Sequence, residues 1–130
     1  MERHPRIIVV DDDAAMRDMI VCMLDCAGFD AEPAADAEGA LFALRDRPYD
    51  LAVCDVYMPR RDGFSFARAA HEIRPGMPIV LMSSFGCAAT ERDAAAAGAS
   101  GFIAKPFSSE RLRNAVHAAL SPRAAASAPS

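Results

Sequence analysis

Short apolar runs alternate with longer segments of helical periodicity along most of the chain, and this alternation limits the possible folds more than any other feature. Residues 7–10 (IIVV) are β-branched throughout, and residues 50–54 (DLAVC) and 79–82 (IVLM) form similar runs. Runs of this length are too short for helices and are typical of strands buried on both faces. A weaker run, residues 29–35 (FDAEPAA), and a final run, residues 100–104 (SGFIA), complete five predicted strands. Pro33 places the run at 29–35 near an edge of the sheet.

A segment with apolar residues at helical spacing follows each predicted strand. These five predicted helices span residues 13–28, 36–47, 63–73, 89–99 and 108–120. Asp13, Asp36 and Ser108 are predicted N-caps, and Gly28 is predicted to end the first helix. Strands and helices that alternate at these lengths predict right-handed crossovers and a parallel sheet covered on both faces. The predicted fold class is therefore α/β, a single-domain, doubly wound (βα)5 sandwich.

The size and charge of the chain narrow its cellular role. With 130 residues, 52% of them hydrophobic, the chain has material for one core, which we assign to residues 1–120. Residues 121–130 (SPRAAASAPS) are small or polar and predict a flexible tail or the stub of a linker.

The formal charge of −4 argues against direct binding to nucleic acid. No run is long enough to cross a membrane and the start (MERHPR) lacks a secretory pattern, so we expect a cytoplasmic protein.

Four cysteines, Cys22, Cys26, Cys54 and Cys87, are scattered through apolar segments. This distribution does not resemble a disulfide framework and predicts reduced thiols. Cys22 and Cys26 lie four residues apart on a predicted helix and would supply half of a metal site. Because no second pair of Cys or His follows at ligand spacing, the interpretation as buried or surface thiols is favoured.

Polar and charged residues follow the strongly apolar strands, where ligands of open parallel sheets bind. Asp11 and Asp12 follow the first strand, Asp55 the third, Ser83 the fourth and Lys105 the fifth. Converging carboxylates repel one another unless a cation lies among them, and a donor set of oxygens alone indicates Mg²⁺ or Mn²⁺. A hydroxyl and an ammonium beside such an ion suit a phosphoryl group, and an aspartate can act as nucleophile toward phosphorus. The sequence therefore predicts that Asp55 accepts a phosphoryl group.

Four motifs together resemble the receiver domain of bacterial response regulators, the chemotaxis-type receivers of two-component systems. They are IIVVDDD, DLAVCDVYMPRRDGF, PIVLMSS and AGASGFIAKPF, and they occur in the order and near the spacing of that family, within a match from about Arg6 to Leu120. Each motif alone is weak, and the four in register are highly specific. The resemblance implies a flavodoxin-like sheet with strand order 2-1-3-4-5.

The resemblance also implies roles for individual residues. Asp55 is the implied phosphoacceptor, in a reaction that takes the phosphoryl group from the phosphohistidine of a histidine kinase. Asp11 and Asp12, an oxygen of Asp55 and the backbone carbonyl of Tyr57 are the implied Mg²⁺ ligands. The implied roles of the remaining residues are as follows: Ser83 supplies the hydroxyl that closes on the phosphoryl group, Lys105 the cation that pairs with it, Phe102 the aromatic rotamer switch, and Pro106 a cis proline after Lys105.

Phosphorylation adds about two negative charges near Lys105 and Ser83. We expect both groups to move toward it and Phe102 to follow, which changes the face formed by the fourth helix, fifth strand and fifth helix, around residues 94–102 and 110–117. The implied partners are a sensor histidine kinase or phosphotransfer protein, a downstream protein or output domain, and a second copy in a phosphorylation-dependent homodimer. The chain start favours an N-terminal receiver, either one that stands alone or one cut from a longer regulator.

Two large aromatic residues, Tyr57 and Phe85, occupy rim positions that influence how water reaches the acyl phosphate in this family. We therefore expect a fairly long-lived phosphorylated state. Ser83 replaces the more frequent threonine and keeps its hydroxyl.

Two alternatives remain open from the sequence. A metal-dependent phosphohydrolase would place a second acid two residues after its nucleophile, where this chain has Tyr57, so we expect a signalling phosphoacceptor that catalyses only its own phosphorylation and dephosphorylation. A degenerate receiver would bind partners without phosphorylation, but the acidic set, the hydroxyl and the lysine are all present here.

Overall fold

The computed structural model describes residues 4–84 and 91–121, in which five strands alternate with five helices. The strands are β1 (Arg6–Val10), β2 (Asp30–Ala34), β3 (Leu51–Asp55), β4 (Ile79–Ser83) and β5 (Gly101–Ala104). The helices are α1 (Ala14–Cys26), α2 (Ala37–Asp46), α3 (Gly63–Ile73), α4 (Glu91–Ala96) and α5 (Ser109–Leu120). None of the described helices combines the length and the apolar character needed to span a membrane.

The strands form one parallel sheet in the order β2-β1-β3-β4-β5, which confirms the predicted fold class. Val53 in the centre of β3 pairs with Val9 of β1 and with Val80 of β4. All five residues of β3 and of β4 are buried. Continuous apolar strands are expected where helices cover both faces of a sheet.

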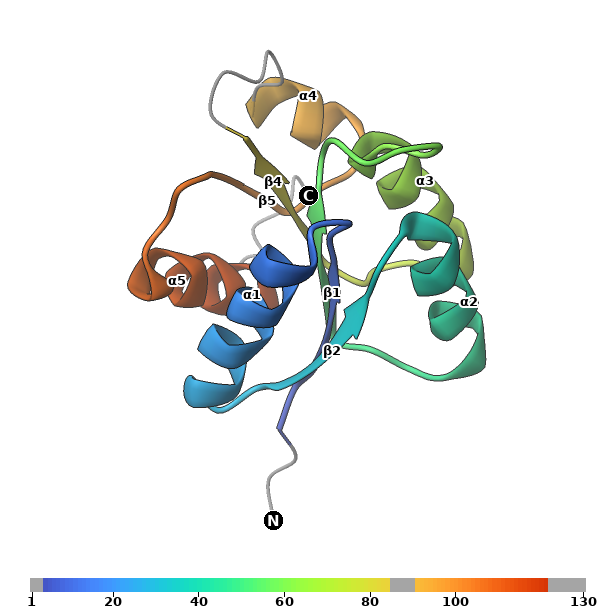
Figure 1. The fold of residues 1–130 in the computed structure, drawn as a ribbon. Helices are drawn as coiled ribbons and strands as arrows, with labels where there is room; N and C mark the ends of the chain where they lie inside the picture. The colour runs from blue at the N-terminus through green and yellow to red at the C-terminus, as the bar shows by residue number, and fades with distance from the viewer. Residues whose placement is uncertain (1–3, 85–90, 122–130) are drawn as a thin grey trace.

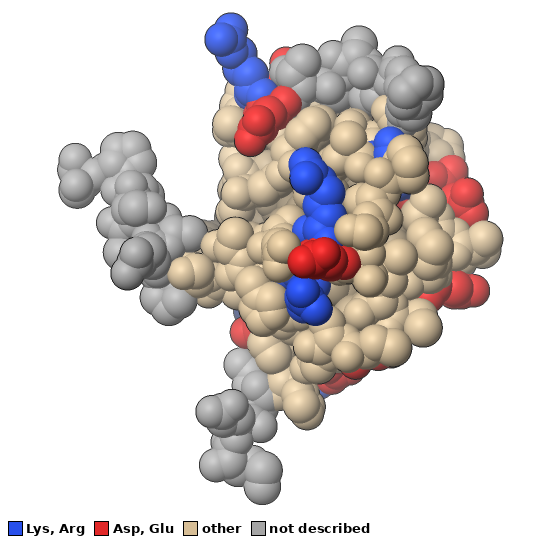
Figure 2. Space-filling view, turned by 90° about the vertical axis from the view of Figure 1, so that its left-hand side faces the viewer, with Lys and Arg blue, Asp and Glu red and all other residues tan. Residues whose placement is uncertain are grey.

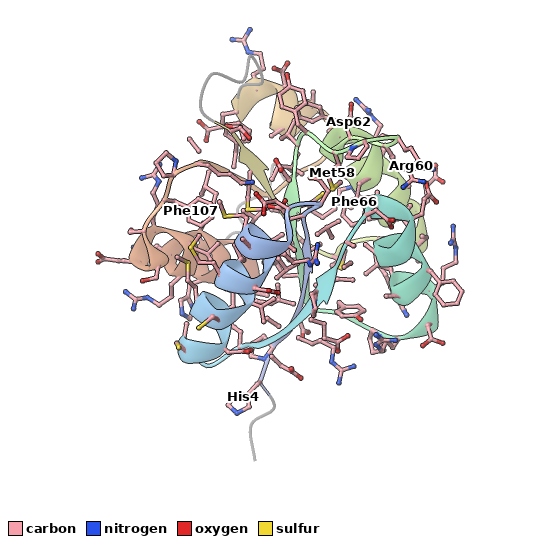
Figure 3. The ribbon with its side chains drawn as sticks, viewed as in Figure 1. His4, Met58, Arg60, Asp62, Phe66 and Phe107 are labelled. Atoms are coloured by element: carbon pink, nitrogen blue, oxygen red, sulfur yellow. The ribbon has the colours of Figure 1, made fainter. Side chains whose placement is uncertain are left out.

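The sheet separates two hydrophobic cores, and Figure 1 shows α1 and α5 on one side of it and α2, α3 and α4 on the other. Side chains along β1 alternate between them, with Ile7 and Val9 in the α1–α5 core and Ile8 and Val10 in the other. Successive strand side chains point to opposite faces, so one strand supplies both cores. Phe66 of α3 is fully buried in the second core (Figure 3).

The predicted edge strand is confirmed, and so are the predicted N-caps Asp13, Asp36 and Ser108. β2 pairs with β1 alone, and Pro33, opposite Val9, is tolerated because an edge strand needs hydrogen bonds on one side only. Side chains at four N-caps accept hydrogen bonds from backbone N–H groups of the first turn: Asp13, Asp36, Asp62 and Ser108. Gly28 follows the end of α1 with φ +95°, a conformation that favours glycine.

The loop from β3 to α3 runs over the carboxyl edge of the sheet, where Figure 3 labels Met58, Arg60 and Asp62, while His4 lies at the opposite end of the molecule. The sequence suggests a turn built by Pro59 and Gly63. The structure instead places a three-residue turn at Pro59, Arg60 and Arg61, closed by a hydrogen bond of 2.8 Å from the Arg61 N–H to the Pro59 carbonyl, with Arg60 at φ +72°. Gly63 is the first residue of α3.

The Lys105–Pro106 peptide bond is cis, as expected. Of the predicted tail, 121–130, only Ser121 belongs to the described residues, so its flexibility stays a prediction. Phe85 and Cys87 also lie outside the described residues.

Candidate functional site

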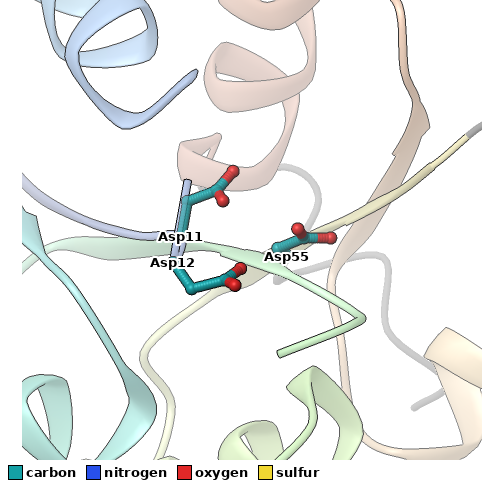
Figure 4. Close-up of side chains that lie close together, drawn as sticks. All are labelled: Asp11, Asp12 and Asp55. Atoms are coloured by element: carbon teal, nitrogen blue, oxygen red, sulfur yellow. The ribbon is translucent and has the colours of Figure 1, made fainter. Parts of the chain in front are cut away.

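Three carboxylates converge at the carboxyl edge of the sheet (Figure 4). Asp11 and Asp12 directly follow β1, Asp55 is the last residue of β3, and β1 and β3 are neighbours in the sheet. One oxygen from each carboxylate lies within 4.8 Å of the others. Asp11 and Asp55 are buried and Asp12 is exposed. The predicted acidic cluster is therefore brought together, open to solvent on the Asp12 side.

Lys105 reaches this cluster from the end of β5. Its Nζ donates to Oδ2 of Asp11 at 3.0 Å and to Oδ2 of Asp55 at 3.1 Å, so the ammonium bridges two carboxylates from different strands. Burial opposes the charge on Lys105, but the hydrogen bonds and negative charges of Asp11 and Asp55 outweigh it, and the pKa of Lys105 is raised. Burial is also the main cause that raises the pKa of Asp55, and it outweighs the opposing effect of Lys105.

Backbone groups orient both buried carboxylates. The N–H of Asp13 donates to Oδ1 of Asp11 at 2.9 Å, and the N–H of Tyr57 donates to Oδ1 of Asp55 at 3.3 Å. Nη1 of Arg17 donates to the backbone carbonyl of Asp11 at 2.8 Å and ties the start of α1 to the end of β1. Each buried carboxylate thus has one oxygen turned to a backbone N–H and the other to Lys105.

The donor set fits a hard divalent cation. It contains carboxylate oxygens and no sulfur or imidazole, and three carboxylates face one ammonium, so an excess of negative charge remains. Magnesium binds through one or two carboxylates and keeps several water molecules, which suits a cluster that is buried on one side and exposed on the other. Whether the Tyr57 carbonyl joins these ligands stays a prediction.

The remaining predicted residues lie along the neighbouring strands. Ser83 ends β4, is buried, and its backbone carbonyl accepts a hydrogen bond of 2.7 Å from the N–H of Lys105. Phe102 lies further back in β5, opposite Leu81, and is partly buried. Phe102 also lines a cavity of about 520 Å³ together with residues of α5. Ser83 is therefore linked to the acidic cluster by its backbone hydrogen bond to Lys105. Phe102 lies at the cavity between β5 and α5 instead.

Gly63 is a residue of this site whose role the sequence did not indicate. A Cβ atom at Gly63 would lie 2.5 Å from the backbone oxygen of Asp55 and 2.9 Å from Cα of Val56, closer than real contacts allow. The Gly63 N–H donates to the Val56 carbonyl at 2.7 Å. The start of α3 therefore packs directly on the backbone that carries Asp55. A glycine at a helix start is a signal of such close approach, but a weak one, because turns use glycine as well.

The fold and this site define a class of protein: a flavodoxin-like α/β domain with an acidic pocket, bridged by a lysine, at the carboxyl edge of its sheet. Residues 7–117 match the family model of the response regulator receiver domain, and the chain belongs to that family. The family serves two-component signalling, in which receiver domains act with histidine kinases and output domains.

Individual relatives agree with this assignment. The chain is 36% identical over 120 residues to the transcriptional regulatory protein FixJ of Bradyrhizobium diazoefficiens, covering 92% of this chain and 58% of FixJ. It is 32% identical over 111 residues to the response regulator receiver protein CpdR of Brucella abortus, covering 85% of this chain and 92% of CpdR. The chemotaxis protein CheY4 of Vibrio cholerae superimposes with a TM-score of 0.83 at 30% identity, covering 91% of this chain and all of CheY4.

Several relatives are much longer than this chain. It spans 26% of ZraR of Salmonella typhimurium, a transcriptional regulatory protein, and 58% of FixJ. These names conflict with the expectation that the protein binds no nucleic acid, which was based on the net charge of the receiver segment alone. The net charge of this chain gives no information about the parts of these longer relatives that the chain does not match.

Proposed function

We propose that this receiver domain accepts a phosphoryl group on Asp55 from the phosphohistidine of a sensor histidine kinase or phosphotransfer protein, in a reaction that depends on Mg²⁺. The observation that carries the proposal is the position of Asp55. It is a buried carboxylate at the end of a central strand, within 4.8 Å of Asp11 and Asp12 and bridged to Asp11 by Lys105. A buried acid with a purely structural role needs one compensating partner such as Lys105, but two further carboxylates beside it add repulsion, which a bound cation would relieve.

The chemistry needs one nucleophilic oxygen and compensation for incoming charge. An oxygen of Asp55 attacks phosphorus, the P–O bond forms as the P–N bond to the histidine breaks, and the leaving imidazole takes a proton from solvent. Asp11, Asp12 and Asp55 would hold the divalent ion, which supplies positive charge for the phosphoryl oxygens. The Tyr57 N–H keeps one Asp55 oxygen oriented. Hydrolysis of the acyl phosphate by water restores the carboxylate.

Lys105 and Ser83 are proposed to carry the signal outward. The ammonium now shared by Asp11 and Asp55 would turn to the phosphoryl oxygens, and the Ser83 hydroxyl would donate to them. A backbone hydrogen bond joins Ser83 and Lys105 at the ends of β4 and β5, and we propose that their movements reach Phe102 through β5. We propose that the face formed by α4, β5 and α5, around residues 94–102 and 110–117, binds an output domain, a downstream protein or a second copy when Asp55 is phosphorylated.

Intact mass spectrometry after incubation with Mg²⁺ and acetyl phosphate tests the phosphoacceptor role. We expect one phosphoryl adduct per chain, which is lost in the Asp55→Asn variant and after chelation of Mg²⁺. Asp62→Asn is the matched control, because Asp62 is an exposed aspartate that caps α3 beside the site. Equal labelling of the Asp55→Asn protein would refute the proposal. Sustained turnover of acetyl phosphate would indicate a phosphohydrolase instead, and no adduct at all would indicate a degenerate receiver.

The proposed output face is tested separately, by the self-association and partner affinity of the protein with and without a phosphoryl mimic on Asp55. We expect tighter association with the mimic. Unchanged affinity would contradict the role of this face and leave the phosphoacceptor assignment intact.

A further inference from the structure

Four side chains that contain sulfur line one face of α1, away from the acidic site. Met19, Cys22, Met23 and Cys26 follow the spacing i, i+3, i+4 and i+7, which places them on one side of a helix. Ile20 and Leu24 are the fully buried residues of α1, and Met23 packs against the same core from the edge of the sulfur face. Met19 is 42% exposed, both cysteines are exposed, and Met23 is partly buried.

These four residues share a groove between α1 and α5. The groove has a volume of about 400 Å³, and Ala27, Ser109 and Arg113 complete its lining. Figure 2 shows the side of the molecule on which α5 lies, where most of the surface is uncharged and the charged side chains form small islands. The sequence suggested half of a metal site at the two cysteines and lacked a second pair of Cys or His. The structure supplies further sulfur donors from methionines on the same helix face.

The two thiols are close enough to influence each other. Repulsion from Cys26 is the main cause that raises the pKa of Cys22, and both thiols are free. Cβ atoms four residues apart on a helix are separated by about 5–6 Å. A disulfide needs a Cβ separation of about 3.5–4.5 Å, so the intact helix opposes a bond between the two sulfurs. Two metal–sulfur bonds of about 2.3 Å span the larger gap without distortion of the helix.

We propose that this groove binds one soft monovalent cation, Cu(I), through the thiolates of Cys22 and Cys26, assisted by the thioethers of Met19 and Met23. Thiolate and thioether ligands select soft metals such as Cu(I), whereas the oxygen donors at Asp55 select hard ones. Binding releases two thiol protons to solvent and leaves the bound ion and its two thiolates with one net negative charge. Arg113 on the α5 wall of the groove supplies the compensating positive charge.

Anaerobic titration of the reduced protein with Cu(I), in competition with a chromophoric Cu(I) chelator, tests this site. Native mass spectrometry of the same samples gives the stoichiometry. We expect one tightly held Cu(I) per chain, lost in the Cys22→Ser/Cys26→Ser double variant. Replacing Met19 and Met23 with leucine, which keeps their bulk, is expected to weaken the Cu(I) affinity at least tenfold, since only the thioethers are removed.

Two controls separate this site from other candidates. Cys87→Ser removes a thiol elsewhere in the chain, and Asp55→Asn alters the acidic site, and neither is expected to change the Cu(I) affinity or stoichiometry. Cu(I) binding that persists unchanged in the double serine variant, or a reduced wild-type protein that loses all Cu(I) to the chelator, would overturn the proposal. Circular dichroism of each variant establishes that the fold is retained.

Discussion

At the scale of single residues, the acidic site combines groups that the sequence could place and contacts that it could not. Asp11, Asp12, Asp55 and Lys105 were predictable, because each follows an apolar strand and parallel strands deliver their carboxyl ends to one edge. The sharing of one ammonium between Asp11 and Asp55 was not predictable, since it depends on the path of a long side chain from β5. Arg17 carries no pattern that would reveal its bond to the Asp11 carbonyl.

Tyr57 gives a prediction at this scale. Its side chain is 54% exposed beside Asp55, and its bulk at the rim is expected to hinder water from reaching the acyl phosphate. The Tyr57→Ala variant should therefore lose its phosphoryl group several times faster than the wild type, with the backbone N–H to Asp55 kept. The decay of the phosphorylated protein, followed by intact mass after removal of the donor, measures this rate. Tyr57→Phe should behave as wild type, and an unchanged or slower decay in the alanine variant would reject the shielding role.

At the scale of elements, the strands and caps were predictable to within a residue or two because their signals are local. Short apolar runs predicted β1, β3 and β4, and short polar side chains predicted the N-caps. The fourth helix was predicted to extend to residue 99 because of its alanines, but α4 ends at Ala96. The reason is Gly98 at φ +93°, which ends a helix despite favourable residues before it.

The packing of α3 on β3 gives a prediction at the element scale. In Gly63→Ala the added Cβ would meet the backbone of Asp55 and Val56, so α3 or the end of β3 must shift. Overpacking of this kind is expected to lower the free energy of unfolding by about 1–3 kcal/mol, measured by urea denaturation. Because the shift moves Asp55 itself, we also expect slower phosphorylation by acetyl phosphate.

Gly28→Ala is the control for this experiment. Gly28 has a positive φ and open space around its Cβ position, so the substitution costs about 1 kcal/mol through backbone strain and leaves Asp55 undisturbed. A Gly63→Ala protein that is as stable and as readily phosphorylated as the wild type would show that the close approach has no such consequence.

At the scale of the whole molecule, the sheet has two ends with different roles. The carboxyl end carries the acidic site, and an ion-pair network around Glu32, in the middle of β2, reaches Arg6 and Tyr49 at the amino end. Oε1 of Glu32 accepts hydrogen bonds from Arg47 Nη2 at 2.9 Å and from the Tyr49 hydroxyl at 2.8 Å, and Arg6 lies 3.6 Å from Oε2. Burial and the bond to Glu32 raise the pKa of Tyr49 to about 12. This network joins β1, β2 and the segment before β3.

The network gives a prediction about pH. Burial of Glu32 opposes its ionisation, but the hydrogen bonds from Arg47 and Tyr49 outweigh it and lower its pKa below the ordinary value of 4.5. A carboxyl group whose pKa is lower in the folded than in the unfolded protein stabilises the fold at pH values above its unfolded pKa. This stabilisation is lost as the pH falls through its folded pKa. Glu32→Gln should therefore lower the free energy of unfolding by about 0.5–1 kcal/mol at pH 7, and by less below pH 4.5.

Urea denaturation of the wild type and of Glu32→Gln, at pH 7 and at a pH below 4.5, measures this difference in the free energy of unfolding. Glu38→Gln is the matched control, because Glu38 forms an exposed ion pair with Arg61 at 2.8 Å and is expected to contribute little. An equal loss of stability for Glu32→Gln at both pH values would contradict the linkage.

The lysine that bridges Asp11 and Asp55 has a consequence for electroneutrality. Three carboxylates and one ammonium carry a formal charge of −2, which a single divalent ion cancels. Replacing the Asp55 carboxylate by an acyl phosphate of about two negative charges then moves the total by only about one charge. If Asp55 is phosphorylated beside a divalent ion as proposed, the pocket stays close to neutral in both forms, so neither form is strongly disfavoured by charge alone. Reversibility of this kind is what a signal that must be both set and erased requires.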